Sequence, residues 1–202
     1  MRARPRGGRV PVIAALVLLH GGTYFVVTRA TLLRPAGALR DFTTPLDALI
    51  PHLPWTWPLY WIAYPFVILG GGATLLRLPD PSFRRAVGAL VAMILVGAIV
   101  QIAFPARAPW PASPAAAQRR FHESPLVLPY ATLPSMHVAF TLFAAGVRAL
   151  TMATRASYLA GAVVVLLVTV GTLTLKEHVA LDALTGLALA AATLAWWRRP
   201  AR

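Results

Sequence analysis

Six long apolar segments constrain this 202-residue chain more than any other feature of its sequence. As helices of about 17–22 residues, each is long enough to cross a bilayer hydrocarbon core of about 30 Å. Backbone groups in lipid must find hydrogen bonds within the segment, so helices are expected. The segments cover residues 10–28, 55–76, 86–104, 134–150, 157–175 and 179–197. The expected fold is therefore an all-α polytopic membrane protein, built as a six-transmembrane-helix bundle.

Composition supports a membrane class. Hydrophobic residues make up 58% of the chain and charged residues only 12%, whereas soluble domains carry about a quarter charged residues. The length suits one membrane domain over residues 1–202, which begins with a short basic cytoplasmic tail at residues 1–9. This basic start resembles a signal peptide, but the apolar run that follows is too long, so an uncleaved first span is expected.

The net charge of +13 comes from 19 Lys and Arg residues against 6 Asp and Glu residues. The basic residues lie between the apolar segments and at both ends, which favours membrane lipids as partners and argues against nucleic acid. With the N-terminus inside, twelve of the 19 fall on the inner side and seven on the outer side. The positive-inside rule therefore predicts an integral cell-membrane protein with both termini cytoplasmic.

Among the ionisable residues within or bordering the spans, four are singled out: His20, His137, His178 and Asp182. Such residues are functional candidates, because charge is costly in a membrane. His178 and Asp182 are four residues apart, so on a helix they would share a face. A carboxylate beside an imidazole fixes its tautomer and supports its cation, which makes the histidine a better nucleophile or base. A purely structural hydrogen bond is the alternative, and His20 is expected to be structural.

Ser135 and His137 both lie at the start of the fourth span, where free helix N–H groups can bind phosphate. An ordinary helix cap is the alternative. His178 begins the sixth span, so the topology places both histidines at one membrane face. Lys176 and Arg107 belong to the same face. Two histidines, a carboxylate and two cations at one depth indicate a phosphate site on the extracytoplasmic side.

Two segments carry a family resemblance. Leu133-Pro134-Ser135-Met136-His137 and His178-Val179-Ala180-Leu181-Asp182 resemble the second and third motifs of the phosphatidic acid phosphatase type 2 superfamily, in the same order and 40 residues apart. The six-helix plan of that family covers nearly the whole chain. The Ser-Met-His form, the segment at 46–51 and Phe104-Pro105 look most like the inositolphosphotransferase branch, which includes the inositol phosphorylceramide synthases.

The resemblance implies a role for each motif residue. His178 would attack phosphorus, Asp182 would orient it, and His137 would protonate the leaving oxygen. Ser135 and backbone amides would hold the phosphate. The implied substrate is a lipid phosphate, with no metal and no cofactor.

The chain departs from the family pattern in its first motif and at the opening of its third. The first is Lys, six residues, then Arg-Pro, and the third opens with Ser-Arg seven residues before its histidine. The residues that stand at these positions here are Gln101, Ala108, Pro109, Gly171 and Thr172. Arg107 and Lys176 are the nearest substitutes and are predicted to bind phosphate.

Three hypotheses about function stay open from the sequence. The phosphoryl acceptor is either water, which gives a phosphatase and is slightly favoured, or an alcohol, which gives a transferase. A non-catalytic lipid-phosphate carrier on the same scaffold is a second class. A metal site of two histidines and an aspartate ranks lowest, because neighbouring cations would oppose a metal.

In the two long outer loops, residues 46–51 are expected to lie flat in the interface, and His122 and Glu123 are minor candidates for headgroup contact.

Overall fold

The computed structural model describes residues 8–109 and 133–199, and within these ranges every regular element is a helix. Five segments are long and apolar enough to cross a membrane: α1 (Val10–Leu32), the composite span Pro54–Arg77, α6 (Asp80–Ala103), α9 (Arg155–Thr174) and α10 (Ala180–Arg198). A shorter apolar helix, α8 (Met136–Met152), corresponds to the fourth predicted segment. The predicted fold class, an all-α polytopic membrane protein, is confirmed.

The helices that extend furthest beyond their predicted segments are α6 and α1, and local chemistry explains both extensions. α6 begins at Asp80 rather than at residue 86, because Asp80 and Pro81 suit the first turn of a helix. α1 continues to Leu32 rather than ending near residue 28. The hydroxyls of Thr28 and Thr31 donate to the carbonyls of Tyr24 and Val27 at 2.8 and 2.9 Å, so these polar side chains are satisfied within the helix.

The second span is a chain of short pieces rather than one regular helix. Its elements are η3 (Pro54–Thr56), α3 (Trp57–Trp61), α4 (Ala63–Pro65), the π-helix η4 (Phe66–Gly71) and α5 (Gly72–Arg77). Pro65 lacks an N–H and cannot join a regular hydrogen-bond ladder, which accounts for a break here. π-Helical turns of this kind occur frequently at functional sites.

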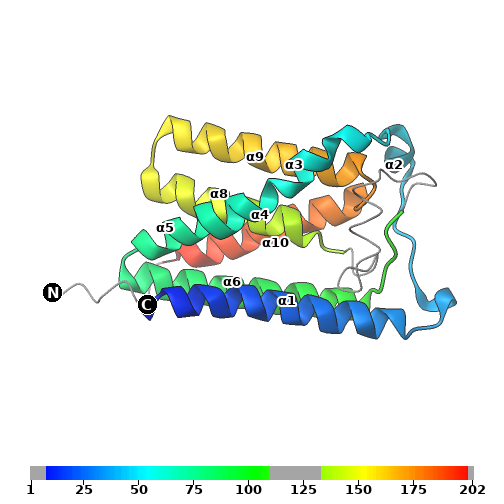
Figure 1. Ribbon diagram of the computed structural model, residues 1–202, viewed down its shortest axis with the longest axis horizontal. Coiled ribbons are helices and arrows are strands. Elements are labelled where there is room, and N and C mark those ends of the chain that lie inside the picture. Colours follow the sequence, from blue (N-terminus) through cyan, green and yellow to red (C-terminus); the bar gives the residue numbers. More distant parts are fainter. Residues whose placement is uncertain (1–7, 110–132, 200–202) are drawn as a thin grey trace.

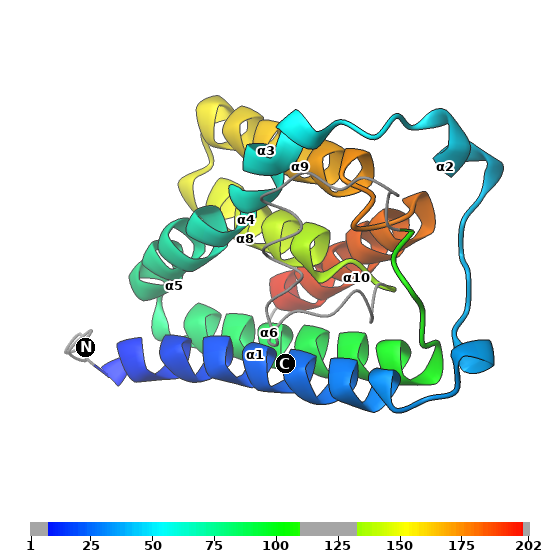
Figure 2. The same cartoon turned by 45° about the vertical axis from the view of Figure 1, so that its right-hand side comes forward.

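α8 is the centre of the bundle. It packs against α9, α10 and η4, while α6 packs against α10 and carries α1 along its other side. Met93 of α6, Phe143 and Val147 of α8, and Ala190 of α10 form part of the buried core. α1 and α6 run side by side along one side of the molecule, and α9 lies on the opposite side (Figures 1 and 2).

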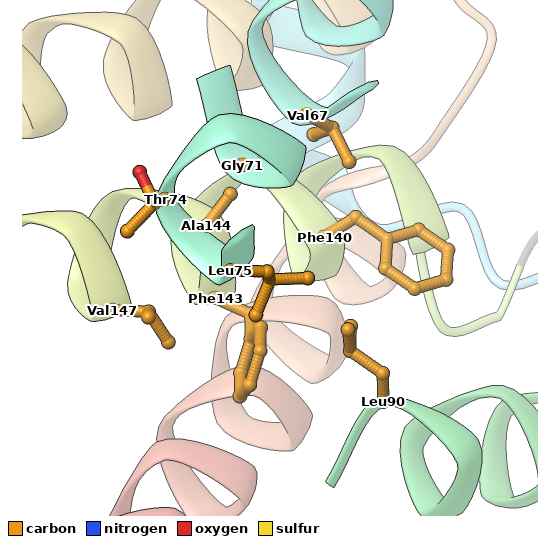
Figure 3. Close-up of a pocket in the computed structure, with 9 residues that line it drawn as sticks. All are labelled: Val67, Gly71, Thr74, Leu75, Leu90, Phe140, Phe143, Ala144 and Val147. Atoms are coloured by element: carbon orange, nitrogen blue, oxygen red, sulfur yellow. The ribbon is translucent and has the colours of Figure 1, made fainter. Parts of the chain in front are cut away.

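A small apolar pocket of about 40 Å³ lies inside the bundle, between the second span, α6 and α8 (Figure 3). Its walls include Val67 and Gly71 of η4, Leu90 of α6, and Phe140 and Phe143 of α8. Phe140 is one turn along α8 from His137, so this pocket lies deeper in the bundle than the beginning of α8.

The two ends of the bundle differ. The beginning of α1 and the end of α10 lie at one end, whereas α2 (Pro45–Leu49) lies at the other (Figure 1). At the first end, Arg9 pairs with Asp80 and also donates to the Leu76 carbonyl at 3.1 Å. The opposite end holds the turn between α9 and α10, to which α2 is hydrogen-bonded. A short 3₁₀ turn, η2 (Ala36–Ala38), belongs to the connection between α1 and α2.

Candidate active site

His178 lies in the turn between α9 and α10. Lys176 adopts a left-handed conformation with φ of 61°, and the amides of Glu177 and His178 both donate to the Thr172 carbonyl, at 3.1 and 3.2 Å. These bonds close the end of α9 and leave His178 two residues before the start of α10. The turn therefore holds the His178 backbone firmly while its ring stays outside the helix.

Asp182 pairs with His178 as predicted, although by a different geometry. The structure joins His178 Nδ1 to Asp182 Oδ2 at 3.2 Å, and the Val179 amide donates to the same oxygen at 3.2 Å. Because α10 begins at Ala180, the contact is a carboxylate reaching back over a helix N-terminus rather than a pair on one helix face. Asp182 is fully buried, and the positive end of the helix dipole favours its charge there.

His137 is in the first turn of α8, and its ring centroid is 5.9 Å from that of His178. Its Nε2 lies 2.9 Å from the hydroxyl oxygens of both Tyr60 and Tyr64. Neither tyrosine was predicted from the sequence to belong to the site. Their signal was available, because two tyrosines spaced i, i+4 in an apolar span put two hydroxyls on one face that must find polar partners.

Ser135 joins the two histidine-bearing motifs. It is completely buried, its amide donates to the Asp182 carbonyl at 2.9 Å, and its carbonyl oxygen lies only 2.5 Å from where a Cβ on Gly186 would be. Ser135 Oγ and Asp182 Oδ1 are buried without a hydrogen-bond partner among residues 8–109 and 133–199. Unsatisfied buried polar atoms are rare in native proteins and are frequent where a ligand or water completes a site.

The two predicted cations lie in different surroundings. Lys176 Nζ donates to the backbone carbonyls of Asp47 and Ile50, at 2.8 and 2.6 Å. An ammonium group has three protons, so one remains for another acceptor. The Arg107 side chain is exposed. Phosphate binding by Lys176 and Arg107 stays a prediction. Gln101, at the position of the missing first-motif lysine, donates to the Pro134 carbonyl at 3.4 Å.

Asp47 is a further residue near the site that was not predicted from the sequence. This buried side chain accepts from the Ala180 amide at 2.7 Å, and from the amide and hydroxyl of Thr44 at 2.8 and 2.7 Å. Burial raises the pKa of the Asp47 carboxyl, but these hydrogen bonds and the charge of Lys176 outweigh it, so the pKa lies below its ordinary value. The capping-box pattern from Thr44 to Asp47 was the available signal.

The remaining candidates are His20, His122 and Glu123. The His20 ring packs edge-on against Phe140, with centroids 4.6 Å apart. His122 and Glu123 belong to residues that the structure does not describe. Within the described part of the chain, no group of three or more His, Asp or Glu side chains is arranged to hold a metal ion.

The arrangement offers three chemical functions within one buried end of the bundle. Since Nδ1 of His178 is engaged by a carboxylate, its Nε2 is the nitrogen left for attack on an electrophile. His137 is close enough to exchange a proton with a group bound to His178. Ser135 and the free amides that begin α8 suit an anion.

Comparison with known proteins gives one finding. A sequence model of the PAP2 superfamily matches residues 25–196, a range that includes both histidine-bearing motifs. No curated protein and no solved structure matches the chain.

Proposed function

The chain belongs to the PAP2 superfamily, whose members are generally phosphatases, and we propose that it is a lipid phosphate phosphatase or phosphotransferase acting through a phosphohistidine on His178. The observation that carries the proposal is the buried contact of 3.2 Å between His178 Nδ1 and Asp182 Oδ2, with the His137 ring 5.9 Å away. A binding protein needs no such nucleophile, so this geometry favours an enzyme over a carrier.

In the first step, His178 Nε2 attacks the phosphorus of a lipid phosphate. The bond from phosphorus to the lipid oxygen breaks, and protonated His137 gives its proton to that oxygen. The product is a neutral lipid alcohol and a phosphohistidine whose positive ring charge is stabilised by Asp182.

In the second step, water attacks the phosphorus while His137, now neutral, accepts a proton from it. The bond from phosphorus to His178 Nε2 breaks, which releases inorganic phosphate and restores both histidines. Throughout, Ser135 and the first amides of α8 hold the phosphate oxygens, with Lys176 and Arg107 adding positive charge.

The reaction proposed here uses side chains where a metalloenzyme would use an ion, so no metal or cofactor is required. We place it in one membrane domain over residues 1–202, with both termini cytoplasmic and the site on the extracytoplasmic face. The arginines before the start of α1 and at the end of α10 support this orientation.

Transfer to an alcohol, as in inositol phosphorylceramide synthases, is the second candidate. The segment at 46–51 resembles that branch, and Asp47 within it accepts a hydrogen bond from Ala180, two residues from His178. An acceptor hydroxyl would replace water in the second step without any other change in chemistry. A non-catalytic lipid-phosphate carrier is the third alternative, because the cations of the first motif are missing from this chain.

The test uses purified protein with a panel of lipid phosphates, and follows phosphate release with and without added alcohols. His178→Ala is expected to abolish turnover and the labelled phosphoenzyme together. His137→Ala should lose roughly 10²–10⁴-fold on a lipid substrate, yet recover on nitrophenyl phosphate, whose leaving group needs little protonation. Asp182→Asn should give a severe but incomplete loss. A labelled adduct on His178→Ala would contradict the proposal.

A further inference from the structure

The two histidines of the candidate site have different kinds of partner. His178 Nδ1 faces the carboxylate of Asp182, whereas His137 Nε2 lies 2.9 Å from the hydroxyl oxygens of Tyr60 and Tyr64. The tyrosine rings also enclose the imidazole, with centroids 4.6 and 5.5 Å from that of His137. Tyr60 is buried, so its hydroxyl is held at this place by packing.

We infer that Tyr60 and Tyr64 are positioning residues for His137 as the proton donor, an inference that rests on the proposed function. A carboxylate strongly stabilises a neighbouring imidazolium, while a neutral phenol orients it without that charge stabilisation. His178 must carry a positive ring in the phosphohistidine, which the carboxylate supports. His137 must give its proton away, which a neutral partner permits.

The hydrogen-bond roles follow from the atoms involved. When His137 is protonated, Nε2–H donates to a tyrosine oxygen and Nδ1–H remains for the substrate. In the first step the Nδ1–H bond breaks and an O–H bond forms on the departing lipid alcohol. In the second step Nδ1 takes a proton from water. Both tyrosines keep their own protons throughout, so their contribution is the orientation and tautomer of the ring.

A departure from the family pattern explains how the tyrosines reach His137. Gly171 stands where the third motif opens with serine, and a Cβ at Gly171 would lie 2.7 Å from the Tyr60 amide nitrogen. Any larger residue would push α3 away from α9. The regular helix breaks after α3, and α4 begins within one turn of that break. Tyr60 and Tyr64 therefore belong to two short helices, yet both contact the imidazole of His137.

The experiment compares Tyr60→Phe, Tyr64→Phe and the double variant on two substrates, a lipid phosphate and nitrophenyl phosphate. Each change removes one oxygen and keeps the ring. On the lipid phosphate, kcat/KM is expected to fall roughly 10-fold for each single variant and roughly 100-fold for the double variant, below the limit set by general acid catalysis. On nitrophenyl phosphate the change should be under about threefold. Tyr158→Phe, an exposed tyrosine on α9, is the matched control and should leave both rates unchanged.

A merely structural role would reduce kcat/KM equally on both substrates, so equal losses would overturn the inference. Full activity of the double variant on the lipid phosphate would overturn it as well. Adding Tyr60→Phe to His137→Ala should cause no further loss, because the tyrosines act through that ring. A further tenfold loss in that background would also refute the inference.

The wild-type protein supplies a measurement that needs no tyrosine variant. Nitrogen NMR of histidine-labelled protein, assigned against His137→Ala, should show neutral His137 with its proton on Nε2; a proton on Nδ1 would refute the inference. Failure of the proposed function is recognised separately, because the wild-type protein would then release no phosphate and form no phosphoenzyme. In that case the inference about Tyr60 and Tyr64 fails together with the proposed function.

Discussion

Replacing Asp47 tests whether α2 holds the turn that carries His178. Asp47→Ala removes three hydrogen bonds, but their costs differ. Thr44 is exposed, so water can replace its two bonds, at a net loss of about 1 kcal/mol. The Ala180 amide is buried, and leaving it without a partner costs about 1–3 kcal/mol. The expected loss in the free energy of unfolding is therefore about 2–4 kcal/mol.

For a protein of this size, 1 kcal/mol shifts the melting temperature by about 2–4 °C, so Asp47→Ala should melt roughly 5–15 °C lower in detergent. Turnover should fall as well, because Ala180 is two residues from His178. Asp47→Asn keeps an oxygen for the Ala180 amide but loses the charge, and should lose about 1 kcal/mol. Asp41→Ala is the matched control, since exposed Asp41 accepts from the Thr43 amide at 2.8 Å and from no other group among residues 8–109 and 133–199. Equal melting temperatures for Asp47→Ala and Asp41→Ala would refute the reasoning.

Acid should remove the same stabilisation. The pKa of Asp47 is lower in the folded protein than its ordinary value of 3.8, so the unfolded chain binds the proton first as the pH falls. The stabilisation is complete above that ordinary value and is lost as the pH falls through the folded-state pKa. Below pH 4, the melting temperature should therefore fall more steeply with decreasing pH for wild-type protein than for Asp47→Asn. If the melting temperatures of the two proteins fall in parallel, the carboxylate charge contributes nothing to stability.

Three further predictions concern other parts of the molecule. Phosphate release should survive EDTA, because the proposed site uses cationic side chains; loss on chelation with recovery on added zinc or magnesium would favour the metal reading. Single cysteines introduced at 105–133 into this cysteine-free chain should react with an impermeant thiol reagent from outside intact cells, and labelling only after the membrane is opened would reverse the topology. Gly186→Ala should lower turnover at least 10-fold and cost about 1–3 kcal/mol, since its Cβ would collide with the Ser135 carbonyl, whereas Gly21→Ala, with nothing within 4 Å, should leave activity intact.

The helices were predictable because span length and apolarity are properties of each segment alone. The meeting of His137 and His178 followed from topology, since both lie at the start of spans that enter from the same face. The contacts from Tyr60 to His137 and from Asp47 to Ala180 were not predicted. They join residues 77 and 133 positions apart, and depend on how the spans pack sideways. The π-helix after Pro65 likewise depends on tertiary packing, although the proline itself marked a weak point in the span.

The position of His137 and His178 at helix beginnings bears on how a lipid would reach them. Each lies within two residues of the start of its helix, at one end of the bundle. A phospholipid in the adjoining leaflet could present its headgroup there while its acyl chains stay among their neighbours. A charge carried to the bilayer centre costs at least about 2.5–3.5 kcal/mol, and a substrate received at this depth avoids that barrier. The reaction proposed here would therefore consume lipid from one leaflet only, and would leave lipid exchange between leaflets to other proteins.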